Sequence, residues 1–313
     1  MINIYYTDLE TNEFTEINEF RKGAWIHLVN PSEKEISFVC NNLNIEEDFI
    51  RYPLDFEEKA RIDTEDDVKL FIIDVPIIEE KDDDTIYTTM PLGMIVVRDD
   101  FFITVSLHEC KFMDDFINSR VKGFFTYKKT RFILQILYTN SSAFLSILKQ
   151  INKESEATVF LLQKSMKNRE LIQLLNLENS LVYIATSLRS NEVVMEKTLN
   201  GKVIKLYEED EDILEDAIVE NKQAIEMSKI YSDILSGTMD AYASIISNNV
   251  NSVMKFLAAI TIVLSLPTML ASFWGMNVNV PFAQSPYGFF FLLLASVILC
   301  ILVAFWLKKR DMF

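Results

Sequence analysis

The sequence predicts an α+β cytoplasmic domain, then a long stalk helix that continues into the first of two transmembrane helices near the C-terminus. Three observations predict this fold class. Early in the chain, short β-branched or aromatic runs alternate with polar breaks; the middle has helical periodicity; and two charge-free apolar runs follow. These runs, residues 256–274 and 286–307, are each about as long as the roughly 20 residues that span a bilayer.

The composition limits the classes of partner. The net charge of −16 comes from 46 acidic against 30 basic residues, nearly all of it ahead of Val253, so the protein should attract cations and repel nucleic acid. The seven glycines form neither a phosphate loop nor a dinucleotide fingerprint, so we expect no nucleotide. Cys40, Cys110 and Cys300 are far apart, which predicts neither a disulfide framework nor a thiolate zinc site.

Residues 1–127 are predicted to form the cytoplasmic α/β domain. Ser32 and Glu35 have the spacing of a capping box, which predicts a helix from Ser32 to Leu43. The acidic run from Glu79 to Asp84 separates two predicted strands and indicates a solvated hairpin tip. No nucleophile, base and orienting residue form a recognisable set, so we expect no enzyme.

Residues 128–207 predict long antiparallel helices, because Gly and Pro almost vanish and apolar residues recur at spacings of three and four. Residues 208–274 predict the stalk helix, which becomes the first transmembrane helix at about 253–274. The carboxylates from Glu208 to Asp212 suit its N-terminus. Its first proline is Pro267, so nothing earlier forces a break.

The distribution of basic residues predicts the topology. The connection at residues 275–285 has neither Lys nor Arg, whereas Lys255 precedes the first span and residues 308–313 begin with Lys-Lys-Arg after the second. The positive-inside rule then places both chain ends in the cytoplasm and the connection outside. We expect a two-span protein of the cell inner or plasma membrane, in contact with lipid.

A stripe of small and polar residues follows the long helix in steps of three and four. It comprises Asp240, Ser244, Ser247, Asn251, Met254, Ala258, Thr261, Ser265, Thr268 and Ser272. Small and hydroxyl residues favour a close helix contact, but a series that begins with a carboxylate and ends near Asn277 fits an ion path. Several copies of the helix would then enclose a polar tube.

Apolar residues interrupt the polar series at one point, and a proline lies within the same helix. Met254 and Leu257 lie near the membrane entrance, where a ring of apolar side chains can close a pore by dewetting; ordinary packing explains them equally well. Pro267 removes one helical N–H and frees the carbonyl of Val263, a loss that nearby hydroxyls or water in a lumen can offset.

Gly275-Met276-Asn277 closes the first span, before a short connection and a basic tail, and SGTMDAYASIISNNVNSVMKFL precedes it. In these features the chain resembles the CorA family of magnesium transporters. The resemblance implies a funnel-shaped homopentameric channel for passive influx of divalent cations, with Mg²⁺ as the ion and Co²⁺ or Ni²⁺ as alternatives. A divalent ion gains about 4.6 kcal/mol per 100 mV on entering a negative interior.

The resemblance also implies residue roles. Gly275, Met276 and Asn277 would form the outer mouth, with Asn277 as a ring that selects the hydrated ion. Polar pore-lining residues would be Asp240, Asn251, Thr261, Ser265 and Thr268, with Ser272 in the same stripe, and Met254 with Leu257 would form the hydrophobic gate. A neutral amide ring suits Mg²⁺, which sheds its water reluctantly.

Cytoplasmic Mg²⁺ closes family members by bridging acidic residues of neighbouring subunits. The resemblance places Asp216 at the carboxylate position on the stalk helix, but Tyr52 stands where the partner aspartate is expected. Asp55 lies one helical turn away. Regulatory Mg²⁺ at Asp216 and Asp55 is therefore one hypothesis, and a merely solvated acidic face at Asp216 is the other.

Two other functions remain open at this point. One is a zinc-transporting relative of the same fold, although His27 and His108 lie in or beside predicted strands and favour core or surface roles. The other is a membrane-anchored helical scaffold or sensor without a pore.

Overall fold

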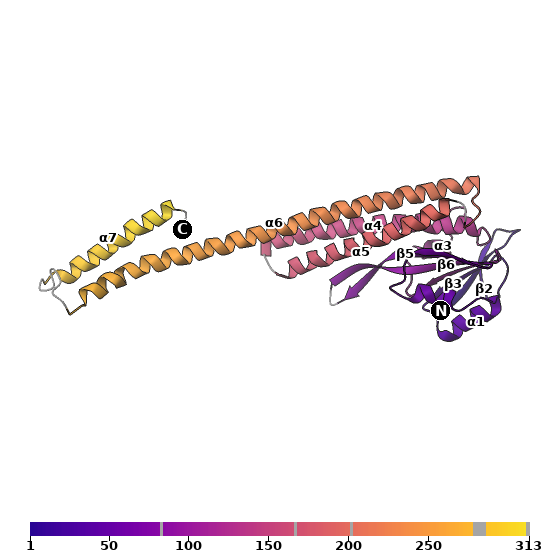
Figure 1. Ribbon diagram of the computed structural model, residues 1–313, viewed down its shortest axis with the longest axis horizontal. Coiled ribbons are helices and arrows are strands. Elements are labelled where there is room, and N and C mark those ends of the chain that lie inside the picture. Colours follow the sequence, from indigo (N-terminus) through magenta and orange to yellow (C-terminus); the bar gives the residue numbers. More distant parts are fainter. Residues whose placement is uncertain (82–83, 166–167, 201–202, 278–285, 311–313) are drawn as a thin grey trace. The chain divides into compact units, whose positions relative to one another are not determined.

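The computed structural model describes residues 1–81, 84–165, 168–200, 203–277 and 286–310. The chain divides into two compact units, Met1–Ser236 and Gly237–Phe313. The first unit contains a β-sheet with helices packed on it, and the second contains two helical segments (Figure 1).

A mixed seven-stranded sheet forms the centre of the first unit, in the order β2-β1-β3-β7-β6-β5-β4. The strands are β1 (Ile2–Thr7), β2 (Phe14–Ile17), β3 (Trp25–Val29), β4 (Arg61–Glu65), β5 (Val68–Lys81), β6 (Asp84–Val97) and β7 (Phe101–Ser106). Strands β3 and β7 pair in parallel, with Ile26 opposite Ile103. The other neighbouring pairs recorded are antiparallel.

The hairpin of β5 and β6 is confirmed, but its tip is shorter than predicted. Pairing continues to Lys81 opposite Asp84, so Glu79 and Glu80 belong to the strand rather than to the loop. Residues 82–83 lie outside the described part of the chain. The ladder continues there because each added residue pair gains backbone hydrogen bonds even where the side chains are polar.

Helices cover both faces of this sheet (Figure 1). They are α1 (Glu33–Leu43), α2 (Asp48–Arg51), the 3₁₀ turn η1 (Tyr52–Leu54), α3 (Met113–Ile117), α4 (Lys129–Ser165) and α5 (Asn168–Leu199). The alternation of side chains along β5 explains the two layers. Leu70 and Ile72 enter the core under α1 and α2, whereas Phe71 and Ile73 enter the core under α3, α4 and α5.

The predicted helix after Ser32 is confirmed as α1. The Ser32 backbone N–H donates to Glu35 Oε2 at 2.7 Å, as part of a complete capping box. Asn44 ends the helix in the left-handed conformation, with φ of 51°, which Asn adopts more readily than most residues.

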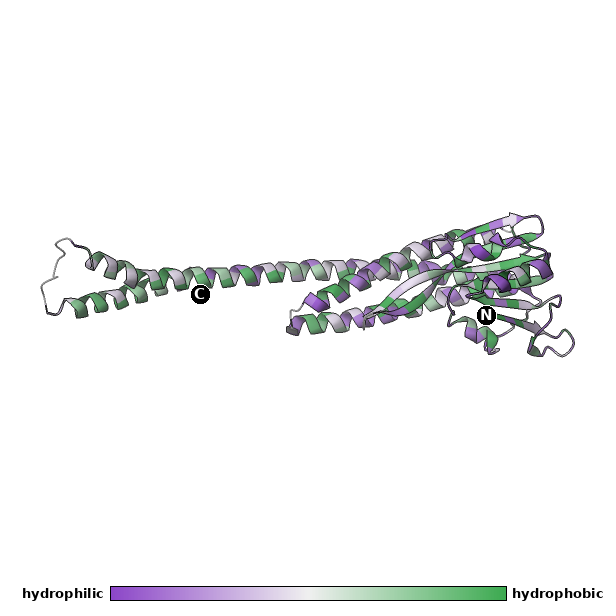
Figure 2. Cartoon of the chain, turned by 90° about the horizontal axis from the view of Figure 1, so that it is seen from below, coloured by the Kyte–Doolittle hydropathy of each residue, from purple (hydrophilic) through white to green (hydrophobic). Residues whose placement is uncertain are grey.

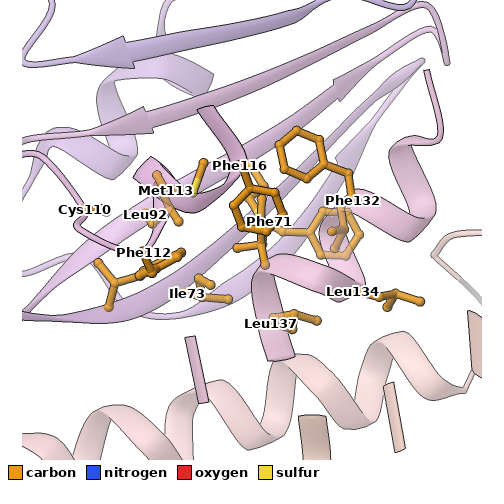
Figure 3. Packing of buried hydrophobic residues seen from close by; sticks show 14 of the residues in the cluster. Phe71, Ile73, Leu92, Cys110, Phe112, Met113, Phe116, Phe132, Leu134 and Leu137 are labelled. Carbon is orange, nitrogen blue, oxygen red and sulfur yellow. The ribbon is translucent and has the colours of Figure 1, made fainter. Parts of the chain in front are cut away.

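Aromatic rings join α4 to the sheet (Figure 3). The ring of Phe132, near the start of α4, lies 5.0 Å from Trp25, 4.5 Å from Phe124 and 5.1 Å from Phe116, measured between centroids. Such contacts each add about 1 kcal/mol beyond the burial of area. The long helices therefore share a hydrophobic core with the sheet.

Asp74, in the middle of β5, links the sheet to α4 and α5 through its backbone. Pro91 stands opposite it in β6 and has no N–H to donate. Instead, the buried side chains of Asn140 and Asn191 donate to the Asp74 carbonyl at 2.9 and 2.8 Å. Asn191 also accepts the Asp74 N–H at 2.8 Å. Side-chain amides thus satisfy the backbone groups that the strand ladder leaves open.

Replacing Asp74 with Asn should stabilise the protein at neutral pH. Burial raises the pKa of the Asp74 carboxyl from 3.8 to about 6, partly offset by a hydrogen bond from Ser187. Because the folded state binds more protons, wild-type stability falls as pH rises between these values, by about 3 kcal/mol in all. Thermal unfolding should give Asp74→Asn a higher Tm at about pH 7.5 but not at about pH 4. An equal difference at both pH values would contradict this assignment.

The remaining helices are α6 (Glu208–Trp274) and α7 (Gly288–Lys309). With 67 residues, α6 is about 100 Å long at 1.5 Å per residue. Its first turn contains Glu208, Glu209, Asp210 and Glu211, so the acidic cluster is part of the helix and opposes the positive end of the dipole. The C-terminal part of α6 and all of α7 are long and apolar enough to cross a membrane (Figure 2).

Candidate functional site

In the second unit, one side of α6 packs against α7. Ala259 is fully buried, and Val263, Leu266 and Leu270 are half-buried. These four residues recur at steps of three and four and form the α7-facing stripe of α6. On α7 the matching residues of reduced exposure are Ser296, Cys300, Val303 and Leu307.

The predicted polar stripe lies on roughly the opposite side of α6, at about 100° of rotation per residue. In the single chain its members within the apolar part of the helix are all exposed: Asn251, Met254, Ala258, Thr261, Ser265, Thr268 and Ser272. Asp240, at the stripe's start, is exposed too. One helix therefore has an apolar side that packs within the chain and a polar side that is left open.

Hydroxyl groups of the polar stripe donate to carbonyls of their own helix. Thr261 Oγ1 donates to Leu257 O at 2.8 Å, Ser265 Oγ to Ile262 O at 2.8 Å, and Thr268 Oγ1 to Ser265 O at 2.7 Å. Each hydroxyl has only one proton, so its oxygen can offer only lone pairs to the outside. The stripe is thus a surface of acceptors, which suits the outward-pointing hydrogens of water molecules bound to a cation.

Met254 and Leu257 are 62% and 57% exposed in the single chain. They lie on the same side of α6 as the polar stripe, where that helix enters its apolar segment.

The Gly-Met-Asn tripeptide directly follows the end of α6. The Gly275 N–H donates to Ala271 O at 2.9 Å, which completes the last helical turn. Asn277 is exposed, and Met276 is 53% exposed. A Cβ on residue 275 would lie 3.4 Å from the Ala271 carbonyl oxygen. The rest of the predicted outer connection, residues 278–285, lies outside the described chain.

The predicted regulatory residues are on separate elements of the first unit. Asp216 is an exposed residue of α6, and Asp55 is exposed after η1, where its Oδ1 accepts the Glu57 N–H at 3.0 Å. Over the parts of the chain with assigned positions, no three His, Cys, Asp or Glu side chains form a group that could hold a metal.

Tyr52 stands at the position where the resemblance leads us to expect an aspartate, and its ring contacts the side chain of Arg61. The Arg61 guanidinium carbon lies 5.0 Å from the centre of the Tyr52 ring, within the range of cation–π attraction. Arg61 also pairs with Glu58 and Asp63. This contact could not be predicted from the sequence, because nothing in the spacing of Tyr52 and Arg61 indicates that the two side chains meet.

His27 is a core residue of β3. Burial lowers the pKa of its imidazole to about 4, and its Nδ1 lies 2.8 Å from Thr104 Oγ1, which also accepts a hydrogen bond from Trp25 Nε1. The ring is therefore neutral at physiological pH. Its place in the core agrees with the role expected from the sequence.

The described chain thus combines an α/β unit with the helices α6 and α7, which are both long and apolar enough to cross a membrane, and α6 has an open polar side. The family model described as "CorA-like Mg2+ transporter protein" matches residues 21–309. The chain therefore belongs to the CorA-like Mg²⁺ transporter family, whose members carry divalent cations across membranes and are not enzymes.

Relatives and solved structures agree with this family. The chain is 25% identical over 298 residues to the cobalt/magnesium transport protein CorA of Methanocaldococcus jannaschii, covering 92% of this chain and 90% of that protein. The complete structure of the magnesium transporter CorA from the same organism matches with a TM-score of 0.83 at 22% identity, covering 97% and 96% of the two chains. The predicted fold class is confirmed.

Another solved structure is more distant. The cytoplasmic domain of ZntB from Vibrio parahaemolyticus matches with a TM-score of 0.60 at 12% identity, covering 80% of this chain and 97% of that one. At this identity the likeness concerns the fold alone.

Proposed function

We propose that this protein is a homopentameric channel that admits hydrated Mg²⁺ passively into the cell, with one copy of α6 from each subunit lining the pore. The observation that carries the proposal is the two-sided character of α6. Its apolar side packs on α7, while the open side has the acceptor hydroxyls of Thr261, Ser265 and Thr268. Five such sides around an axis make a polar tube.

The membrane orientation follows from charge. Lys255 precedes the first apolar segment, and α7 ends with Lys308 and Lys309, followed by Arg310. With these basic residues inside, the N- and C-termini are cytoplasmic and the Gly-Met-Asn tripeptide is at the outer mouth. Influx then needs no energy-coupling site, because an inside-negative potential drives a divalent ion inward by about 4.6 kcal/mol per 100 mV.

Selection is assigned to Asn277. The amide is exposed after the last turn of α6, and a ring of five amides can bind the water shell of an ion without removing it. Mg²⁺ holds its water in a strict octahedron and dehydrates slowly, so a site that recognises the hydrated ion admits it quickly. Co²⁺ is the second candidate ion, since the Methanocaldococcus relative is named a cobalt/magnesium transport protein.

Closure is assigned to Met254 and Leu257, whose rings would expel water from a narrow pore. The regulatory hypothesis is that cytoplasmic Mg²⁺ bridges Asp216 of one subunit to Asp55 of the next and stabilises the closed state. Because Arg61 already contacts Tyr52 beside this position, we expect the cation site to be weaker than one built from two facing aspartates.

Ion-resolved flux into proteoliposomes tests the proposal. Purified full-length protein is reconstituted with a negative interior potential, and entry of Mg²⁺, Co²⁺ and Zn²⁺ is measured with and without Mg²⁺ on the side of the soluble domain. We expect Mg²⁺ entry that increases with potential and decreases when Mg²⁺ is present on the soluble-domain side.

The other outcomes separate the alternatives. Entry of Zn²⁺ without Mg²⁺ would assign the protein to zinc transport. An assembled protein that passes none of the three ions would refute transport and favour a scaffold or sensor. Mg²⁺ entry that ignores Mg²⁺ on the soluble-domain side would refute the regulatory hypothesis while leaving the channel intact.

A further inference from the structure

The carbonyl of Val263 has lost its usual partner in α6. In an α-helix this group accepts the N–H four residues later, but that position is Pro267, which has no N–H. The helix nevertheless continues to Trp274. Val263 belongs to the α7-facing stripe and not to the open side of α6, so a protein group has to supply the donor for its carbonyl.

The hydroxyls closest in sequence do not supply this donor. Ser265 Oγ donates to Ile262 O and Thr268 Oγ1 donates to Ser265 O, one residue before and two residues after Val263. On the neighbouring helix, Ser296 Oγ donates to Leu292 O within α7. Each of these three hydroxyl protons is donated to another carbonyl, so none of them caps Val263 O in the structure.

The second helix supplies the donor as a thiol. Cys300 Sγ lies 3.5 Å from Val263 O, a distance suited to a sulfur donor. Cys300 is half-buried on the face of α7 that also contains Ser296 and Leu307. The thiol thus reaches across the contact between α6 and α7 to the one carbonyl that Pro267 leaves open.

We infer that Cys300 is a positioning residue for ion passage: its thiol caps the Val263 carbonyl and holds the direction of the pore-lining helix across Pro267, a residue type that kinks helices. This inference rests on the proposed channel function. Pro267 lies between Thr261 and Asn277. Asn277 follows Pro267 by ten residues, about 15 Å at a rise of 1.5 Å per residue. A change in bend of about 5° would shift Asn277 by about 1.3 Å over that length, enough to disturb a ring that recognises a hydrated ion.

A double-mutant cycle between Cys300 and Pro267 tests the inference. Cys300→Ala should lower Mg²⁺ flux about threefold, the effect of one interhelical hydrogen bond in a membrane. Cys300→Ser should retain most of the flux, since a hydroxyl can donate to the same carbonyl. In a Pro267→Ala background the restored N–H occupies Val263 O, so Cys300→Ala should then have no further effect.

Ser296→Ala is the matched control, because Ser296 is on the same face of α7 and donates only within its own helix; its flux should equal that of the wild type. If Cys300→Ala lowers flux by the same factor in both backgrounds, or if Cys300→Ser behaves like Cys300→Ala, the thiol acts only by packing and the inference fails.

Infrared spectroscopy of the S–H stretch tests the hydrogen bond without measuring transport. The band that disappears in Cys300→Ala should lie at the lower frequency of a hydrogen-bonded thiol. A free-thiol frequency for that band would overturn the inference. If the wild-type protein passes no ion, the proposed function fails, but this measurement still decides whether Cys300 caps Val263.

Discussion

Replacing Asn277 with Ala should abolish Mg²⁺ uptake while leaving the assembly intact. Asn277 is exposed after the last turn of α6, so its removal disturbs no packing. Each lost amide hydrogen bond removes about 1 kcal/mol. In a ring of five, the combined loss should lower flux by at least about 100-fold, at about 1.4 kcal/mol for each factor of ten.

Initial rates of Mg²⁺ entry into proteoliposomes at fixed potential measure this effect. Asn42→Ala is the matched control, since Asn42 is also an exposed amide but lies on α1 and donates to Phe38 O within that helix. Asn277→Gln keeps the amide but displaces it, and should give an intermediate rate. Undiminished entry through an assembled Asn277→Ala protein would show that the selective site is elsewhere.

Replacing Leu257 with Asn should produce a channel that no longer closes. Leu257 is 57% exposed on the open side of α6, and a polar amide there removes the barrier that an apolar ring presents to water. When Mg²⁺ is present on the soluble-domain side, we expect the wild-type channel to be nearly closed. Under this condition the flux through Leu257→Asn should exceed the wild-type flux by about 10-fold or more, since lowering the barrier by about 1.4 kcal/mol gives that factor.

Phe256→Asn is the control for this experiment, because Phe256 is at the same depth but about 100° around the helix from Leu257. It should leave the closed state unchanged. If Leu257→Asn also leaves flux unchanged under closing conditions, Leu257 is an ordinary packing residue at the membrane boundary.

Local signals predicted much of the fold. The capping box at Ser32 and Glu35 located α1, and apolar periodicity predicted the long helices. The strand order could not be predicted, because the parallel pairing of β3 with β7 joins segments that are far apart in sequence. The backbone hydrogen bonds of Asp74 could not be predicted either, since its partners Asn140 and Asn191 come from two other elements.

The same distinction applies to the candidate site. The polar stripe could be predicted because one helix carries all of it, and spacing alone places its members on one side. The contact between Cys300 and Val263 could not be predicted, because α7 is apolar around its whole circumference and does not reveal its register against α6. The missing N–H at Pro267 was the only signal, and it indicated that a donor was needed without indicating which one.

The proposed cap on the Val263 carbonyl can form only after α7 has been synthesised. When α6 first enters the bilayer, the Val263 carbonyl has no donor, because Cys300 belongs to α7, which is synthesised later. An unsatisfied carbonyl in lipid is unfavourable, so we expect the first span to reach its final state only when the second has inserted beside it. We therefore expect α6 and α7 to reach their final packing together, and a chain truncated before α7 would lack the Cys300 donor for the Val263 carbonyl.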